Sequence, residues 1–186
     1  MVKIISIANQ KGGVGKTTTS INLATSLSAI NKKTLLIDAD PQGNASTGIG
    51  ISYEKRSPNL YDLIVNEVLD LNAIKKTIVP GLDIITANTN LAASEIELVE
   101  VKNREFVLLN LLSKIEGYDY ILIDCPPALG FLTINALVAS QSIIIPLQSE
   151  FFALEGISSL VNSVELIRES FNPNLIIEGI LLTMVD

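Results

Sequence analysis

The chain has no histidine and only one cysteine among its 186 residues. A disulfide framework needs paired cysteines, and the common zinc sites need several cysteine or histidine ligands. A histidine general base is also impossible. These absences exclude disulfide-stapled secreted proteins, His-based zinc enzymes and hydrolases that rely on a catalytic histidine.

Long apolar runs are lacking too, since no stretch approaches the ~18 uninterrupted apolar residues of a membrane-spanning helix. The first residues, Met-Val-Lys-Ile-Ile-Ser-Ile, read directly as the start of a strand. They show neither the basic segment nor the cleavage site of a secretory signal. We therefore expect a cytoplasmic chain with no membrane partner.

Basic residues are in the minority, because 13 Lys and Arg stand against 20 Asp and Glu and the net charge is −7. Binding to DNA phosphates needs clustered Lys and Arg, so this balance argues against a strongly DNA-attracting surface. Apolar residues make up 48% of the chain. We expect a substantial core within one large domain over residues 1–186.

Short apolar runs alternate with segments of helical periodicity, and no repeat, low-complexity tract or linker interrupts them. Such runs suit a parallel sheet covered on both faces, and the alternation indicates an α/β fold with a mainly parallel sheet flanked by helices. The predicted strands are residues 4–8, 34–38, 82–86, 120–124, 142–146 and 175–183. The predicted helices are residues 20–30, 61–65, 71–76, 91–102, 104–115, 132–139 and 154–170, with a loop at 39–50.

The stretch after the first predicted strand is rich in glycine and contains Gly-Lys-Thr. Strand, glycine-rich loop and helix form the setting of a phosphate-binding loop, in which Lys16 would reach the terminal phosphates and the Thr17 hydroxyl would bind Mg²⁺. The plainer interpretation is a glycine-rich turn between strand and helix. The candidate nucleotide-binding residues in this stretch are Lys11, Gly12, Gly13, Val14, Gly15, Lys16, Thr17 and Thr18.

Two apolar strands end in a carboxylate, at Asp38 and Asp124. In open α/β sheets, ligands bind beyond the carboxyl ends of the strands, where the glycine-rich loop also lies. The run that ends in Asp124 is a Walker B-type element, whose carboxylate holds Mg²⁺ directly or through water. An aspartate at a strand end can also form a turn or cap a helix.

The loop departs from the standard G-x-x-x-x-G-K-[ST] pattern, since Gln10 stands at its first glycine and Lys11 precedes the glycines. The sequence Lys-Gly-Gly-Val-Gly-Lys-Thr resembles the deviant Walker A motif of the ParA, MinD and nitrogenase-iron-protein group of ATPases. This resemblance implies a three-layer P-loop NTPase fold that binds ATP or ADP with Mg²⁺. It also implies an ATP-dependent homodimer, in which Lys11 crosses to the nucleotide phosphates of the partner subunit.

The same resemblance implies roles for the carboxylates. Residues 38–44 match the family's switch I, in which Asp40 orients the attacking water and Asp38 supports the magnesium shell. The loop after Asp124 is at the position of switch II, which senses the γ-phosphate, and Glu150 matches a residue near the partner's nucleotide. The implied catalytic residues are Lys11, Lys16 and Asp40, and the implied metal-site residues are Thr17, Asp38 and Asp124.

Within this group, Asp-Pro-Gln-Gly-Asn at residues 40–44 is most similar to ParA/Soj chromosome-partitioning ATPases. MinD-type proteins usually differ there, and a single cysteine cannot supply the two per subunit of the nitrogenase iron protein. The resemblance implies Mg-dependent ATP hydrolysis that is weak without a ParB-like centromere-binding partner. It also implies a cytoplasmic protein that associates with the nucleoid when ATP-bound and drives chromosome or plasmid partitioning.

Family members continue beyond a Leu-Thr-Met segment, here residues 182–184, so we expect this chain to lack the C-terminal portion of the family fold. The resemblance assigns completion of the adenine pocket and non-specific DNA binding to that portion, and so to a full-length parent. Three alternatives remain open. They are a MinD-like or plasmid-encoded positioning ATPase, a nucleotide-binding regulatory protein without significant turnover, and a small-molecule kinase, against which Lys11 argues.

Overall fold

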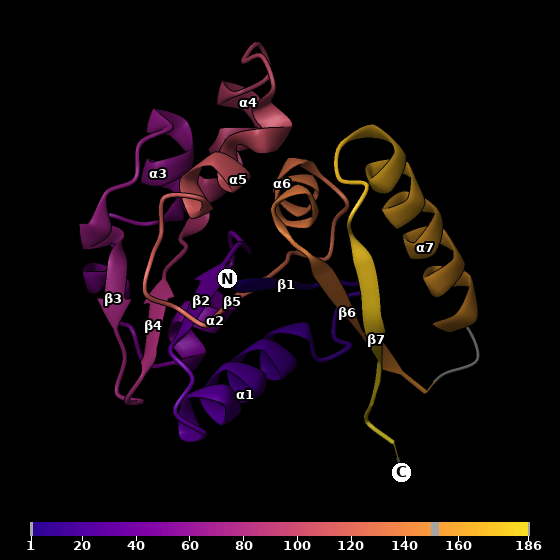
Figure 1. Ribbon diagram of the computed structural model, residues 1–186, viewed down its shortest axis with the longest axis horizontal. Coiled ribbons are helices and arrows are strands. Elements are labelled where there is room, and N and C mark those ends of the chain that lie inside the picture. Colours follow the sequence, from indigo (N-terminus) through magenta and orange to yellow (C-terminus); the bar gives the residue numbers. More distant parts are fainter. Residues whose placement is uncertain (1, 150–152, 186) are drawn as a thin grey trace.

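The computed structural model describes residues 2–149 and 153–185, with the backbone alone for residues 153–156. In this part of the chain, seven strands form one sheet in the order β3-β4-β2-β5-β1-β6-β7 (Figure 1). All neighbouring strands pair in parallel except β3 and β4, which are antiparallel. The strands are β1 Lys3–Ile7, β2 Thr34–Asp38, β3 Ile74–Lys76, β4 Leu82–Ile85, β5 Tyr120–Asp124, β6 Ser142–Gln148 and β7 Ile176–Thr183.

Helices cover both faces of the sheet, with α1 and α2 on one face and α3 to α7 on the other (Figure 1). The described part of the chain contains no helix with the length and apolar character that crossing a bilayer would require. The α-helices are α1 Lys16–Ala29, α2 Asn44–Gly48, α3 Leu60–Asn66, α4 Ser94–Glu97, α5 Val107–Leu112, α6 Phe131–Ala139 and α7 Ala153–Ser170. The 3₁₀ turns in the described part of the chain are η1 Tyr53–Lys55, η2 Leu71–Ala73, η3 Thr89–Ala93 and η4 Arg104–Phe106.

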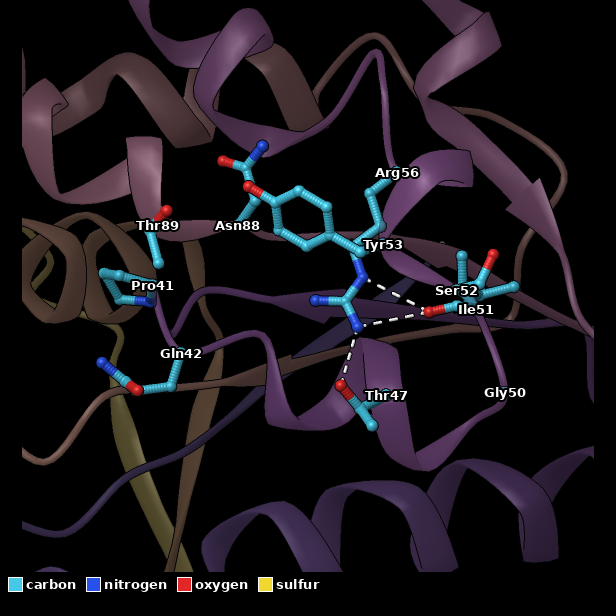
Figure 2. Close-up of a pocket in the computed structure, with 10 residues that line it drawn as sticks. All are labelled: Pro41, Gln42, Thr47, Gly50, Ile51, Ser52, Tyr53, Arg56, Asn88 and Thr89. Atoms are coloured by element: carbon cyan, nitrogen blue, oxygen red, sulfur yellow. Dashed lines mark hydrogen bonds between the residues drawn. The ribbon is translucent and has the colours of Figure 1, made fainter.

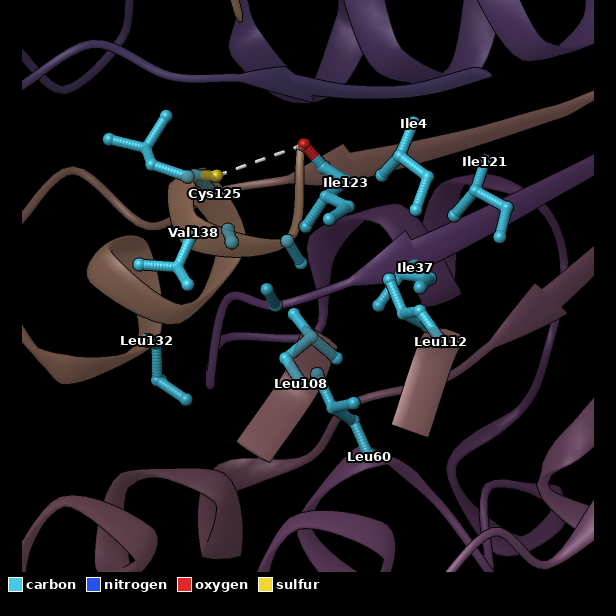
Figure 3. Packing of buried hydrophobic residues seen from close by; sticks show 14 of the residues in the cluster. Ile4, Ile37, Leu60, Leu108, Leu112, Ile121, Ile123, Cys125, Leu132 and Val138 are labelled. Carbon is cyan, nitrogen blue, oxygen red and sulfur yellow. Dashed lines mark hydrogen bonds between the residues drawn. The ribbon is translucent and has the colours of Figure 1, made fainter. Parts of the chain in front are cut away.

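The central strands are apolar on both faces because each face packs against helices. On β2, Leu35 and Ile37 belong to the larger core cluster, under α3, α5, α6 and α7, whereas Leu36 belongs to the cluster under α1. Figure 3 shows the larger cluster, in which Ile37 and Ile123 lie opposite Leu108 of α5. Successive side chains on a strand point to opposite faces, so uninterrupted apolar runs fill both layers at once.

The predicted α/β fold with a mainly parallel sheet is confirmed, and each predicted strand is present within two residues of its predicted bounds. The helix predicted at residues 71–76 is wrong, because only η2 forms there and β3 follows it. β3 is an edge strand that pairs with β4, with Ile74 opposite Ile85. This pairing depends on the position of β4 in the folded chain, and the local hydrophobic periodicity of residues 71–76 contains no information about that position.

Two further segments differ from the sequence prediction. The loop predicted at 39–50 contains α2, which begins after Gly43 at φ +64 and is held by hydrogen bonds from Ser46 to Asp38. The helix predicted at 91–102 is limited to η3 and α4, followed by turns. For α2, the hydrogen bonds to Asp38 are tertiary contacts that override local propensity.

The core analysis predicts a large difference between two leucine-to-alanine substitutions. Leu36 is fully buried on β2, whereas Leu71 is 66% exposed. Leu36→Ala should lower the free energy of unfolding by about 2–5 kcal/mol, through lost burial and a residual cavity. Leu71→Ala should change it by no more than about 0.5 kcal/mol. Urea denaturation followed by far-UV circular dichroism measures both, and equal losses would contradict the assigned core.

Candidate functional site

The glycine-rich loop joins the carboxyl end of β1 to the start of α1, as the sequence predicts. Gly15 is the N-cap of α1 with φ +86, and no side chain caps this helix end. Gly12 and Gly13 are exposed, with open space around their Cα atoms. The first N–H groups of α1 and the positive end of its dipole are therefore available to an anion.

This loop lines a cavity of about 400 Å³. The other walls come from segments that follow three further strands, namely β2, β5 and β7. The cavity thus lies beyond the carboxyl ends of the parallel strands, where α/β sheets bind ligands. Its lining residues are Gly12, Gly13, Gly15, Lys16, Thr17, Thr18, Asp40, Gln42, Asn44, Pro127 and Met184.

Lys16 is the buried cation of the site. Its side chain is only 8% exposed, and its Nζ donates to the Lys11 carbonyl oxygen at 2.9 Å. Burial lowers the pKa of Lys16, while Asp124 acts in the opposite direction. A buried ammonium is stable only with anionic partners, so a phosphate in the adjoining cavity would favour its charged form.

Asp124 stands at the carboxyl end of β5 and is fully buried. Its Oδ1 accepts a hydrogen bond from the Ser20 hydroxyl at 2.9 Å, whereas Oδ2 has no partner in the described part of the chain. Burial raises the pKa of Asp124 to about 7, with Asp38 adding to the rise and the hydroxyls of Thr17 and Ser20 opposing it. A buried carboxylate oxygen without a donor suits a cation or a water bound to one.

Asp38 lies beside Asp124, because the two residues are partners in the β2–β5 register. Its oxygens are already engaged, since Oδ2 accepts from the Ser46 backbone N–H and hydroxyl at 2.7 Å and Oδ1 from the Asp40 N–H at 3.3 Å. Burial raises its pKa to about 6. Neither Asp38 nor Asp124 is among the residues that line the cavity. The hydrogen bonds of Asp38 tie it to switch I and α2, whereas Asp124 keeps one oxygen without a partner in the described part of the chain.

Asp40 follows β2 and lines the cavity together with residues of the glycine loop. It is 9% exposed, and its Oδ1 accepts from the Gln42 N–H at 2.9 Å. The second oxygen makes no hydrogen bond within the described residues. A carboxylate held in this way by its own loop can accept a hydrogen bond from a water in the cavity.

Magnesium is the metal ion that the family resemblance implies for this site. Residues 2–149 and 153–185 contain no group of three carboxylate, cysteine or histidine side chains that could cage a metal ion. Mg²⁺ usually keeps several waters and binds through one or two carboxylates together with substrate phosphates. The Asp124 carboxylate and the Thr17 hydroxyl beside the phosphate loop fit that mode.

Not all predicted residues meet at the cavity. Lys11 is exposed and is not among the lining residues. Val14 is buried and is not among the lining residues either, and its carbonyl oxygen accepts a hydrogen bond from the Thr183 hydroxyl at 2.9 Å. Glu150 lies outside the described residues.

Sequence reasoning missed several residues that shape the site. Ser20 and Ser46 bind the two buried carboxylates, and Met184 lines the cavity from the end of β7. Met184 follows the end of a predicted strand, so the strand-end rule could have found it. Nothing local marks the serines, because their partners are far away in the sequence or across a loop.

A larger hollow of about 520 Å³ adjoins switch I, and Arg56 lies at its base (Figure 2). Arg56 is 6% exposed, and its guanidinium donates to Thr47 Oγ1 at 2.7 Å and to the carbonyl oxygens of Ile51 and Ala87. A Cβ on Gly43 would clash with this guanidinium. The hollow lacks a phosphate loop, so the smaller cavity is the candidate site, and Arg56 anchors switch I beside it.

Comparisons with known proteins show which family the chain belongs to. Residues 2–177 match a family model described as an AAA domain. The chain is 53% identical to the sporulation initiation inhibitor protein Soj of Bacillus subtilis, over all of this chain and 74% of Soj. It is 50% identical to the chromosome partitioning protein ParA of Caulobacter vibrioides, over all of this chain and 70% of ParA.

A solved structure gives the same result for the fold. Cobyrinic acid a,c-diamide synthase from Mycobacterium smegmatis, with bound ADP and magnesium, superposes with a TM-score of 0.95 at 34% identity, covering 100% of this chain and 76% of that chain. The higher identities belong to the partitioning proteins. The chain therefore belongs to the ParA/Soj family of chromosome-partitioning proteins, within the P-loop ATPases.

Proposed function

We propose that this chain binds Mg·ATP in the 400 Å³ cavity, hydrolyses it slowly and uses the bound nucleotide to form a sandwich dimer. The dimer would act in the cytoplasm, on the nucleoid, in chromosome or plasmid partitioning with a ParB-type partner that stimulates turnover. The observation that carries the proposal is the shared lining of one cavity by the glycine loop, Lys16 and Asp40.

The residues have separable tasks in hydrolysis. Phosphoryl transfer needs placement of the attacking water and stabilisation of charge more than covalent chemistry. In the proposed mechanism the loop N–H groups and Lys16 bind the phosphates, and Asp40 holds the attacking water through its unengaged oxygen. Without any histidine in the chain, a carboxylate is the suitable water-positioning group.

The proposed metal residues are Thr17 and Asp124, with Asp38 supporting them from the neighbouring strand. A bound Mg²⁺ would offset negative charge on the phosphate oxygens. The similar structure that was solved with ADP and magnesium supports both cofactors for this chain. Asp38 would act indirectly, since its hydrogen bonds orient Ser46 and the Asp40 backbone.

The proposed dimer depends on Lys11, at the exposed front of the loop. Its backbone is fixed by a hydrogen bond from its N–H to Asn9 Oδ1 at 3.0 Å and by the contact between its carbonyl oxygen and Lys16. A lysine presented outward beside a phosphate site can reach the nucleotide of a second copy. The γ-phosphate then acts as a switch, because it must favour the dimer over the monomer.

The first prediction separates binding from turnover. Asp40→Ala should leave the Kd for Mg·ATP within about threefold and lower kcat by about 10²–10⁴-fold, because only water positioning is lost. Calorimetry and phosphate release measure the two quantities. Asp70→Ala, at an exposed carboxylate that caps η2, is the matched control and should change neither. Wild-type turnover in Asp40→Ala would refute the role.

The second prediction concerns the dimer. Lys11→Ala should retain most of the monomer's affinity for nucleotide but lose ATP-dependent dimerisation, which size-exclusion chromatography with light scattering reports. Lys32→Ala, at an exposed lysine after α1, should dimerise like the wild type. A Lys11→Ala chain that still dimerises with ATP would overturn the crossing-lysine assignment.

The third prediction uses the raised pKa of Asp124, about 7 against an ordinary 3.8. A carboxyl with a raised folded pKa destabilises the folded chain progressively as pH rises from its unfolded to its folded pKa. Asp124→Asn removes this effect. In metal-free buffer, the stability of Asp124→Asn relative to the wild type should therefore rise by about 2 kcal/mol between pH 5 and pH 8.

Urea denaturation at the two pH values gives this difference directly, and any pH-independent cost of the substitution cancels. Mg·ATP should reverse the order at pH 8 by stabilising the wild type alone. A stability difference that is the same at both pH values would contradict the assigned burial of the Asp124 charge.

A further inference from the structure

The hollow beside switch I has a volume of about 520 Å³, which lies in the range of small-molecule sites. Its walls come from the segment after β2, from α2 and η1, and from the segment after β4. Among the described residues that line it, only Arg56 is charged. The proposed nucleotide cycle does not use this space, so its chemistry is a separate question.

The guanidinium of Arg56 is buried without a negative partner. Its acceptors are the Thr47 hydroxyl and the carbonyl oxygens of Ile51 and Ala87, all of them neutral. Within residues 2–149 and 153–185 it forms no ion pair, and Glu54, two residues earlier, is exposed to solvent. Buried charges are normally paired with opposite charge. The base of the hollow therefore favours an anion.

One donor of this guanidinium also lacks an acceptor. Arginine has five N–H groups, and the hydrogen bonds of Arg56 engage Nε–H, both N–H groups of Nη2 and one of Nη1. The second N–H of Nη1 has no acceptor in the described part of the chain. In Figure 2 the guanidinium nitrogen without a dashed line points toward the side of the hollow on which Pro41 and Gln42 lie. A ligand in the hollow can accept this hydrogen bond.

The remaining walls suit a flat organic group. Tyr53 presents its ring beside the guanidinium, with 5.8 Å between Arg56 Cζ and the ring centroid, and is 59% exposed. Gln42 and Asn88 add amide groups, and Thr89 adds a hydroxyl. Aromatic faces stack on planar rings, and amides and hydroxyls both donate and accept hydrogen bonds. The lining thus combines one cation, one aromatic face and neutral polar groups.

We infer that this hollow is a second ligand site, which binds a small molecule with a planar ring and one anionic group. The anionic group would bind at Arg56, and the ring would stack on Tyr53. A triphosphate does not fit this description, because the hollow offers one cation and no glycine loop. The binding half of the inference does not depend on the proposed function.

Gln42 joins the hollow to the nucleotide cavity, since it lines both. Its N–H donates to Asp40, the proposed water-positioning residue. A ligand held between Gln42 and Arg56 would restrict the motion of this segment. Ordering that one ligand has already brought about costs a second ligand less, so the ligand of the hollow should tighten binding of Mg·ATP. This coupling rests on the proposed function.

The first test uses benzoate as the probe, with acetate as the anion without a ring and benzamide as the ring without a charge. Benzoate titrated into the nucleotide-free, ¹⁵N-labelled chain should shift the amide resonances of Thr47, Ser52 and Thr89 with one Kd in the millimolar range, as expected for so small a ligand. Acetate and benzamide should bind there about threefold more weakly or less, since each lacks one contact. Shifts at residues 12–15 report the nucleotide cavity separately.

The outcome is specific because the chain has a net charge of −7, which repels small anions in general. Absence of saturable benzoate shifts at the hollow would overturn the site. N-acetyl-aspartate amide presents a carboxylate as a protein side chain does. If it binds at the hollow more tightly than benzoate, the occupant is a protein carboxylate and the small-molecule assignment is wrong.

The deciding variant is Thr89→Asp, because substituting Arg56 would also release switch I. Thr89 is exposed at the start of η3, where the helix dipole tolerates an aspartate. The added charge should weaken benzoate binding by about threefold or more. Asn162→Asp adds the same charge at an exposed position of α7, over the β6–β7 end of the sheet (Figure 1), and should change it by less than about twofold. Equal weakening by both would mean general repulsion and would overturn the site.

Tyr53→Leu tests the ring contact and leaves Arg56 in place. It should weaken benzoate binding by about threefold and leave acetate binding unchanged, because only stacking is lost. Unchanged benzoate binding in this variant would overturn the assignment of the ring to Tyr53.

The coupling is measured by calorimetry, in which saturating benzoate should lower the Kd for Mg·ATP by about threefold, within the usual range of coupling between sites. An unchanged or raised Kd would overturn the coupling. The two proposals fail separately. Benzoate binding is measured without nucleotide, so a chain that does not bind Mg·ATP would still show it, and an empty hollow would leave Mg·ATP binding and slow hydrolysis in place.

Discussion

Groups of opposite charge are buried at the carboxyl ends of the central strands, and they determine which ligands the site can bind. The parallel register of β2 and β5 sets Asp38 beside Asp124, and Lys16 is buried close by. Burial raises the pKa of both carboxyl groups and lowers that of the lysine, so each charged form is disfavoured alone. A bound metal ion would offset the charge of the carboxylates, and a bound polyphosphate would offset the charge of the lysine. The site is therefore suited to a cation and an anion that arrive together, as in Mg·ATP.

The apolar core fixes this charge arrangement. β2 and β5 are buried on both faces, with Leu36 and Leu122 toward α1 and their neighbours toward the other helices. A slip of one residue would reverse every side chain on the strand, which would turn Asp124 away from Ser20 and the loop. The same burial that stabilises the sheet thus holds two carboxylates where they cost stability, a familiar conflict between function and folding.

The two switch segments are held in different ways. Arg56, almost fully buried, ties switch I to α2 and to the end of β4 through neutral acceptors (Figure 2). Near the end of switch II, the exposed side chain of Glu95 on α4 lies close to Gly130, with its Oε1 2.8 Å from the position that a Cβ there would take. Glu95 is exposed to solvent, whereas Arg56 is shielded from it.

Most of the fold could be predicted from the sequence, because uninterrupted apolar runs and 3.6-residue periodicity are local signals. The loop at residues 12–18 was predicted from its glycine-rich Gly-Lys-Thr motif, and Asp40 from the family resemblance. The structure brings Lys16, Thr17 and Asp40 to one cavity. The strand order was not available, since β5 is inserted between β1 and β2 from a distant part of the chain. That order decides that Asp38 and Asp124 are neighbours.

What the amino-acid sequence determined by itself was the set of chemical groups and the elements that present them, since turn chemistry and hydrophobic periodicity act over a few residues. Only the tertiary structure decided which partners those groups have. It gave Asp38 to Ser46, Asp124 to Ser20 and Val14 to Thr183, and it converted the residues after η2 into an edge strand. Such contacts join residues that only the folded chain brings together, and no local pattern encodes them.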